Sequence, residues 1–258
     1  MVVLEILSPL PLTNRSDGQD FLDLWQTHLP ELLPDRYGNW EPIDRKFDSN
    51  NIGTALDHWV RPFLTAKKRP RSDASVFMRR GAFERLHAIV VFCNELGAAP
   101  QEHLLGFLAA ASLRLKADFA YLHLTTEPEL QLGRANRTAI KLNKQATEFM
   151  FSVPSVDLQR RIPDLYWATV LGAPYLNMFG NERVLSSPAY SSVHLSDNAV
   201  LLQLTEKLAD VEQNYEAFCH VRSDVKTHLG KDAFFSPAKE YSHFYRVPEF
   251  MFFDAEGK

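Results

Sequence analysis

DLYWATVLGAPYLNMFGNERVLSSPAY, residues 164–190, is the stretch around which the rest of the chain is organised. It places four large aromatic residues, Tyr166, Trp167, Tyr175 and Phe179, among glycines and prolines that interrupt helices. Large aromatic side chains dominate core energetics because each buries a large area. We therefore expect an aromatic corner of the core. The alternative is an exposed aromatic patch for a protein partner, because Tyr and Trp are frequent interface anchors.

Two short helices are predicted in the same stretch. Asp164 is a candidate N-cap for a first helix that runs to Leu171. After a turn at Gly172, residues 175–179 are expected to form a second helix that ends at Gly180. The stretch contains no Cys, no His and only three charged side chains. It is therefore a structural segment and holds no catalytic cluster by itself.

Length and composition indicate an ordinary globular protein, with 258 residues of which 45% are hydrophobic and 23% are charged. Such a chain can bury a substantial core. Its best apolar run, Leu104 to Leu113, is too short for a membrane span, and the N-terminus lacks the basic segment of a secretory signal. Cys93 and Cys219 have apolar or aromatic neighbours, as free buried thiols of a reducing compartment do. We expect a cytoplasmic protein without membrane association.

The net charge of −4 is unevenly distributed along the chain. Residues 1–60 carry ten acidic against four basic residues, whereas residues 61–85 carry eight basic against two acidic ones. The acidic segment would steer a basic partner, and the basic segment would bind an anion. A nucleic-acid-binding module is therefore one alternative, with Lys67 to Arg71, Arg79, Arg80 and Arg85 as its contacts. A solvated face is the simpler interpretation of both charge runs.

Hydrophobic periodicity and turn residues predict both helices and strands along the whole chain. Before residue 126 the predicted elements are strands at 2–6, 75–78, 85–92 and 118–125, and helices at 16–33, 49–64 and after Pro100. After residue 126 they are a strand at 148–153, a hairpin of 192–195 with 199–204, a helix from Asp210 to Leu229, and an edge strand at 241–254.

A hairpin followed by a helix is predicted in both halves of the chain. We therefore predict the α+β class, with two related halves that are each an antiparallel sheet covered by helices. Residues 1–258 are expected to form a single compact domain, in which 1–125 and 150–258 form a pseudo-repeat. The two halves share only the dipeptide Ser-Val, so this repeat is one of structure and not of sequence.

The sequence lacks the local signatures of catalytic and metal sites. No CxxC, HExxH or HxxxH spacing is present, and no GxSxG, GxGxxG or Walker loop. An enzyme with a spatially assembled site, in which Cys93 meets His87 or His123, stays open as an alternative. Desolvation in the apolar run around Cys93 disfavours its thiolate. We expect no enzyme, no cofactor and no metal.

Three segments together resemble a known family: RYGNWEPIDRKFD at 36–48, LYWATVLGAPYLNMFGNERVLSSPAY at 165–190, and LGKDAFF at 229–235 followed by YRVPEF. With them the chain is similar, over most of its length, to the immunity protein 52 family of bacterial polymorphic-toxin systems. The resemblance implies a cytoplasmic α+β protein encoded beside a toxin of restriction-endonuclease fold. The type it suggests is the immunity protein of a type VI secretion DNase effector, which binds the toxin and blocks it.

This role is consistent with the acidic, non-catalytic sequence, because a nuclease inhibitor presents acids and aromatic anchors to a basic cleft. The family transfers no individual functional residue. We predict toxin contacts in two loops, one with Tyr37, Trp40 and Glu41 and one with Asn177, Glu182 and Arg183, with Asp35 and Asp44 as supplementary acids. Both aromatic residues of the first loop are expected to be exposed, and no direct nucleic-acid contact is expected.

Overall fold

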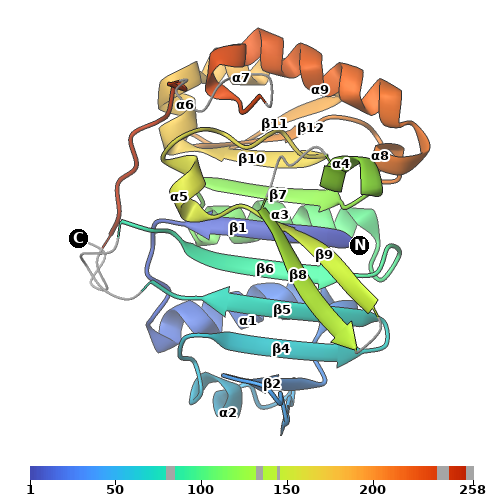
Figure 1. The fold of residues 1–258 in the computed structure, drawn as a ribbon. Coiled ribbons are helices and arrows are strands. Elements are labelled where there is room, and N and C mark those ends of the chain that lie inside the picture. The colour runs from blue at the N-terminus through green and yellow to red at the C-terminus, as the bar shows by residue number, and fades with distance from the viewer. Residues whose placement is uncertain (80–84, 132–135, 144–145, 237–243, 254–258) are drawn as a thin grey trace.

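The computed structural model describes residues 1–79, 85–131, 136–143, 146–236 and 244–253 (Figure 1). Its strands are β1 (Val2–Ser8), β2 (Arg36–Gly38), β3 (Arg45–Lys46), β4 (Phe63–Lys68), β5 (Arg71–Phe77), β6 (Ala88–Asn94), β7 (Phe119–Leu124), β8 (Asn136–Asn143), β9 (Ala146–Ser152), β10 (Ala168–Gly172), β11 (Ser191–Ser196) and β12 (Ala199–Gln203). Its α-helices are α1 (Arg15–His28), α2 (Gly53–Leu56), α3 (Gln101–Arg114), α4 (Glu127–Gln131), α5 (Ser155–Leu158), α6 (Ala173–Phe179), α7 (Asn181–Leu185), α8 (Asp210–Gln213) and α9 (Tyr215–Leu229). Two 3-10 turns, Pro30–Leu32 and Lys231–Ala233, follow α1 and α9.

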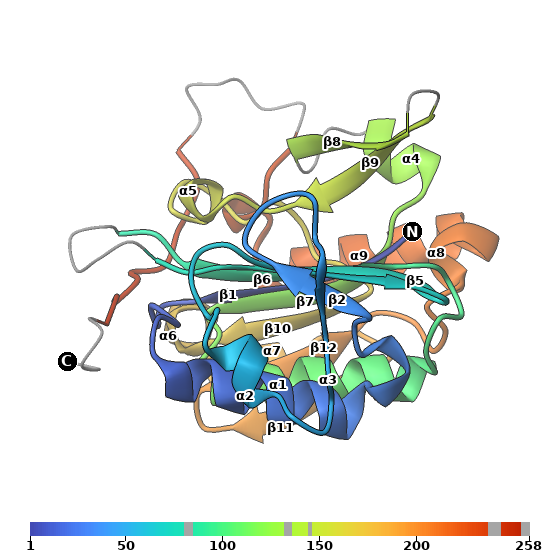
Figure 2. The same ribbon diagram turned by 90° about the horizontal axis from the view of Figure 1, so that it is seen from below.

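One antiparallel sheet of ten strands organises the described residues, in the order β11-β12-β10-β7-β1-β6-β5-β4-β2-β3. The hairpin of β8 and β9 forms a separate small sheet. Figure 2 shows α1, α2 and α3 on one side of the large sheet, and β8, β9, α4 and α5 on the other. We call these two sides the helical face and the mixed face. The central strands are therefore covered on both faces.

Strand β1 shows what this double cover requires of the sequence. All seven of its residues are buried, so the run is almost continuously apolar. Leu4 is in register with Phe92 of β6, which lies on the helical face. There the Phe92 ring packs edge-on against Trp25 of α1, 4.7 Å away, and Phe107 of α3, 5.1 Å away. The core of the helical face is thus an aromatic cluster without charged groups.

Helix α1 begins and ends where local chemistry dictates. Asn14 and Asp17 form a capping box at its N-terminus. The helix ends at His28, ahead of Pro30, so the prediction of a helix to residue 33 was too long. Within it, Gly18 faces the ring of Trp59, where a Cβ would lie only 2.6 Å from the ring. The missing side chain therefore permits the close packing of the Trp59 ring on α1.

The aromatic corner predicted for 164–190 is confirmed. Tyr166, Trp167 and Tyr175 are fully buried, and Tyr166 stacks on Tyr121 of β7 with ring centroids 3.9 Å apart. The helix predicted from Asp164 to Leu171 is wrong, because residues 168–172 form β10 and pair with both β7 and β12. Pairing on two sides outweighs the weak local helix signal. The second predicted helix is confirmed as α6, which ends before a glycine of positive φ.

Elsewhere, the predicted elements with strong local signals are confirmed, among them β1, β7, α3 after Pro100 and the β11–β12 hairpin. The helix predicted at 49–64 is wrong beyond α2, because the chain enters β4 at Phe63 and pairs with β2 and β5. The helix predicted from Asp210 is divided into α8 and α9 at Asn214. The edge strand predicted at 241–254 is wrong for 244–253, which form no strand, and its other residues lie outside the described part.

The α+β class with an antiparallel sheet is confirmed. A hairpin followed by a helix occurs twice, as β5–β6 before α3 and as β11–β12 before α8 and α9. The strands of both halves join in one continuous sheet, because β7 pairs with β10. The pseudo-repeat of 1–125 and 150–258 stays a prediction. No helix in the described part of the chain is long and apolar enough to span a membrane.

Candidate interaction surface

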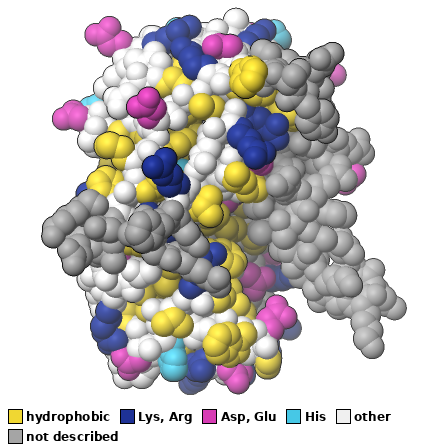
Figure 3. All heavy atoms as spheres, turned by 60° about the vertical axis from the view of Figure 1, so that its left-hand side comes forward, with side chains coloured by type: hydrophobic (Ala, Val, Ile, Leu, Met, Phe, Trp, Pro, Cys, Tyr) yellow, Lys and Arg dark blue, Asp and Glu magenta, His cyan; other side chains and the backbone are white. Residues whose placement is uncertain are grey.

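Exposed apolar side chains gather where one set of strand ends meets the solvent. Leu7 near the end of β1 is in register with Ile89 at the start of β6 and with Phe119 at the start of β7. The ends of β5 and β10 lie on the same side, which is the left of Figure 1. We call this side the strand-end surface and define it by the exposed residues Trp40, Val60, Phe77, Leu86, Leu113, Val156 and Met251. Figure 3 shows hydrophobic side chains on this side of the molecule, with both basic and acidic side chains among them.

Trp40, the tryptophan of this surface, stands on the loop between β2 and β3. Trp40 is 70% exposed, although Trp is usually among the more buried residues. The preceding Asn39 is buried, and its Nδ2 lies 3.1, 3.2 and 2.9 Å from the carbonyl oxygens of His58, Val60 and Pro62. This amide ties the base of the loop to the segment after α2. The loop therefore holds the Trp40 ring out in solvent.

The other predicted contacts of this loop divide into exposed acids and one buried aromatic residue. Asp35, Glu41 and Asp44 are exposed. Tyr37 is only 4% exposed, its hydroxyl donates to the Thr54 carbonyl at 3.1 Å, and its ring stacks on a core phenylalanine. The expectation that Tyr37 is exposed is therefore wrong, because β2 turns this side chain into the core.

The second predicted loop lies far from the first. Five strands separate β10 from β2, which places them roughly 29 Å apart at about 4.8 Å per strand. Asn177 is exposed on α6, and Glu182 and Arg183 are exposed on α7. Arg183 Nε donates to the carbonyl of His228 at 2.7 Å, so its guanidinium is engaged with α9. Only Asn177 of this loop reaches the strand-end surface, where it lines a pocket.

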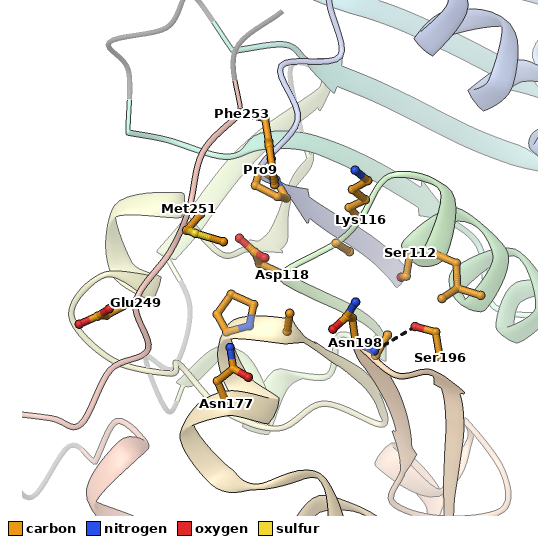
Figure 4. A pocket seen from close by; sticks show the side chains of 15 residues that line it. Pro9, Ser112, Lys116, Asp118, Asn177, Ser196, Asn198, Glu249, Met251 and Phe253 are labelled. Carbon is orange, nitrogen blue, oxygen red and sulfur yellow. Dashed lines mark hydrogen bonds between the residues drawn. The ribbon is translucent and has the colours of Figure 1, made fainter. Parts of the chain in front are cut away.

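Two pockets open on the strand-end surface. The larger has a volume of about 490 Å³ and lies between the end of β1, the C-terminal end of α3, and α6 (Figure 4). Its lining includes Asp118, Asn177 and Met251, so we call it the Asp118 pocket. The smaller pocket, of about 230 Å³, is lined by Phe77, Leu86 and other apolar side chains together with the polar residues Arg61, Arg79, His87 and Ser155. The surface thus has both protruding and concave features.

A buried polar chain connects the two pockets. His87 Nδ1 lies 2.7 Å from Ser155 Oγ, and His87 Nε2 lies 2.9 Å from Asp118 Oδ2. The Asp118 carboxylate is an acceptor, so the N–H at Nε2 of His87 donates to it. Burial raises the pKa of Asp118, and the hydrogen bond from His87 opposes that shift.

These three residues have the composition of a hydrolase triad, and all three are buried. Ser155 Oγ also accepts from the backbone N–H of His87 at 2.8 Å, so this serine bonds both the ring and the backbone of His87. The bonds hold α5 against the start of β6 and β7. Sequence reasoning missed Ser155 and Asp118, because Ser155 lies 68 residues from His87 and no spacing motif links them.

The cysteine–histidine pair that stayed open as an alternative is not formed. Cys93 is in register with Val3, and Val3 is in register with His123, so strand β1 lies between thiol and imidazole. His87 lies just before the opposite end of β6. Burial raises the pKa of Cys93 to about 12, which leaves the thiol protonated and unreactive at neutral pH.

The basic segment 67–85 does not form one patch. Lys67 lies near the tip of the β4–β5 hairpin and donates to the Leu33 carbonyl at 2.9 Å. Arg79 follows the opposite end of β5 and is buried. Arg85 is exposed beyond it, whereas Arg80 lies outside the described residues. Because β5 separates the two groups by roughly 20 Å, the described charges do not line one nucleic-acid groove.

A second buried polar group lies on the mixed face and joins α4 to α9. Arg222 forms a bidentate pair with Glu129, with both N–O distances 2.8 Å, and the Tyr215 hydroxyl donates to the same carboxylate. His123 Nδ1 accepts from the backbone N–H of Trp167, so its Nε2–H faces Glu129 at 3.3 Å. Hydrogen bonds from Arg222 and His123 hold the pKa of Glu129 well below its usual range, although burial opposes them.

No family model and no curated protein matches the chain. Among solved structures, the chain is similar to the Pseudomonas aeruginosa T6SS protein PA0821. The two share 12% sequence identity, the similarity covers 92% of this chain and 84% of that chain, and the TM-score is 0.54. At this identity the similarity shows a shared fold alone. The resemblance to the immunity protein 52 family stays a prediction.

Proposed function

We propose that this chain is a non-enzymatic immunity protein. It acts in the cytoplasm, where it binds and neutralises a cognate secreted nuclease toxin, a DNase of restriction-endonuclease fold, and so protects the producing cell. The strand-end surface is the contact. The observation that carries the proposal is Trp40, a 70% exposed tryptophan on a loop that Asn39 anchors at its base.

An exposed tryptophan held in place is the kind of side chain that dominates protein interfaces. Trp is enriched among hot-spot residues, and a loop whose base is already anchored by Asn39 loses less backbone freedom when it binds. From β2 to β7 the strand-end surface extends over five strand spacings, or roughly 24 Å. That length suits an interface that buries about 800 Å² on each partner.

Charge supports the same partner. Glu41 and Asp44 are exposed beside Trp40, whereas Asp35 is exposed at the opposite end of β2, where its Oδ2 accepts from the Lys68 N–H. A nuclease carries basic side chains where it holds phosphates, so acids at the rim of Trp40 complement it and speed association. The fold shared with a protein described as belonging to a type VI secretion system is consistent with this role.

The test is co-expression with the toxin encoded beside the gene. Cells that carry both proteins should survive, and the two should co-purify. Trp40→Ala should weaken the complex by about 30-fold or more, since hot-spot truncations cost at least about 2 kcal/mol. Tyr190→Ala is the matched control, because Tyr190 is also exposed but precedes edge strand β11 at the far end of the sheet.

Each other outcome would change the proposal in a different way. Survival without a stable complex would replace binding by enzymatic detoxification. Failure to protect the cells at all would remove the immunity role. Equal losses in the Trp40 and Tyr190 variants would place the contact elsewhere on the molecule.

A further inference from the structure

The Asp118 pocket has an acidic, hydrogen-bond-accepting interior and apolar walls. Figure 4 shows the Asp118 carboxylate among the lining side chains, between Met251 and the Asn177 side chain of α6. Only Oδ2 of this carboxylate accepts from His87, so the group retains accepting capacity. Leu113 and Met251 supply exposed apolar surface at the rim. The pocket therefore suits a guest with an aliphatic stem and a polar, donor-rich end.

Electrostatics indicates the sign of that end. Asp118 and Glu249 line the pocket, and its walls include both the C-terminal end of α3 and the N-terminal end of α6, whose dipoles oppose each other. Lys116 is the basic side chain of the described lining, and its ammonium lies 5.2 Å from the centroid of the Phe253 ring. Burial raises the pKa of Asp118, a cost that a cationic guest would relieve.

Other polar side chains of the lining add acceptors to the carboxylate of Asp118. Asn177 and Asn198, both exposed, contribute amide oxygens, and Ser196 contributes a hydroxyl. These oxygens can accept hydrogen bonds from a donor that enters the pocket.

We propose that the Asp118 pocket binds the guanidinium group of an arginine side chain that the partner protein inserts. The planar guanidinium offers five N–H donors to carboxylate, hydroxyl and amide oxygens, while its stem packs against Leu113 and Met251. This inference rests on the proposed function, because a nuclease exposes such arginines where it holds DNA. The pocket would occupy an arginine that otherwise contacts phosphate.

The probe is propylguanidinium, titrated into the isolated protein and followed by NMR, with butyrate as the anionic comparison. The wild type should bind propylguanidinium and not butyrate. Asp118→Asn should weaken the probe by at least about tenfold, because it removes the charge but keeps an oxygen for His87. Lys116→Ala should strengthen it about two- to threefold by removing a like charge.

Thermal unfolding shows whether Asp118→Asn still folds, and if it does not, Lys116→Ala carries the test. Butyrate binding in preference to the guanidinium, or probe affinity unchanged in the folded Asp118 variant and in the Lys116 variant, would overturn the proposal. The probe needs no toxin, so the two proposals fail separately. If the protein protects the cells but does not bind propylguanidinium, only the arginine pocket is rejected. If it binds propylguanidinium but does not protect the cells, only the immunity role is rejected.

Discussion

The two faces of the ten-stranded sheet are buried by opposite means. On the helical face, Trp25, Phe92 and Phe107 interlock without a charged group among them. On the mixed face, a carboxylate and a guanidinium, Glu129 and Arg222, are buried together beneath α9. An apolar core gains stability in proportion to the area it removes from water, whereas a buried ion pair gains it only while every partner is present.

The mixed face therefore depends on the pairing of its buried charges, whereas the helical face depends on how closely its apolar side chains fill the space. Loss of an apolar side chain leaves a cavity, whose cost depends on how far its neighbours collapse. Loss of one charge leaves its partner buried and unpaired. Both faces are covered in the described residues, so the available surface lies at the strand ends, where Trp40 and the Asp118 pocket are.

Removal of the Arg222 charge should have the largest effect. Arg222→Met preserves much of the volume but leaves Glu129 buried without its bidentate partner, so we expect a loss of about 3–5 kcal/mol in the free energy of unfolding. Urea unfolding measures it through the midpoint. Arg114→Met is the control: its pair with Asp20 is solvent-exposed and should contribute less than about 1 kcal/mol. Equal losses of unfolding free energy in the two variants would contradict the explanation that burial of the Arg222–Glu129 pair makes its disruption costly.

Truncation of Trp25 tests the cost of a cavity on the helical face. Trp25→Ala should cost about 3 kcal/mol, at the low end for a buried aromatic residue. The low end applies because the Trp25 indole N–H is buried without a hydrogen-bond partner among the described residues, and truncation removes that cost too. The loss should not depend on pH, since the cluster holds no titratable group. A loss that varies steeply between pH 5 and 8 would contradict this description.

Glu5 provides a pH-dependent test of the mixed face. Burial raises its pKa from 4.5 to about 8, although Tyr121 and the Val153 N–H both donate to Oε2. The folded state therefore holds a proton that the unfolded state releases. The contribution of Glu5 to stability should be highest below pH 4.5, fall by about 1.4 kcal/mol per pH unit as the pH rises toward 8, and then level off.

Glu5→Gln should remove this decline, which urea midpoints at pH 6 and 8 would measure. The variant should lose less stability than the wild type between these two values. Glu129 acts in the opposite direction, because its folded-state pKa is lowered and its contribution is lost as the pH falls below about 4.5. A wild type whose stability rises from pH 6 to 8 would contradict the buried neutral state of Glu5.

The parts of the fold that were predictable from sequence are those set by neighbours in the chain. The α1 face with Phe21, Leu22 and Trp25 is buried at helical spacing, and α3 follows Pro100 as expected. Strand β10 was not predictable, because its partners β7 and β12 are distant in sequence and Gly172 must fit against the carbonyl of Ala117. Pairing between distant segments leaves no local periodicity to detect.

In the candidate site, too, the features set by neighbouring residues were predictable and those set by distant segments were not. Trp40 was recognised because a large aromatic residue beside glycine and proline marks a loop, and it is exposed. Tyr37, three residues earlier, was assigned to the solvent although the short strand β2 turns it inward. Arg222 and Glu129 lie 93 residues apart, and nothing in either segment indicates the other. Buried charge pairs were therefore the least predictable feature.

The smallest effect on stability should come from the most exposed tryptophan. Trp40→Ala removes as many atoms as Trp25→Ala, but its ring is already in water, so the free energy of unfolding should change by less than about 0.5 kcal/mol. Urea unfolding of the two variants side by side measures the contrast. Because Asn39, and not the Trp40 ring, anchors the loop, the fold does not need this side chain. If Trp40→Ala keeps full stability but loses the complex, the ring serves partner binding. If instead its free energy of unfolding falls by nearly as much as that of Trp25→Ala, the ring belongs to the core.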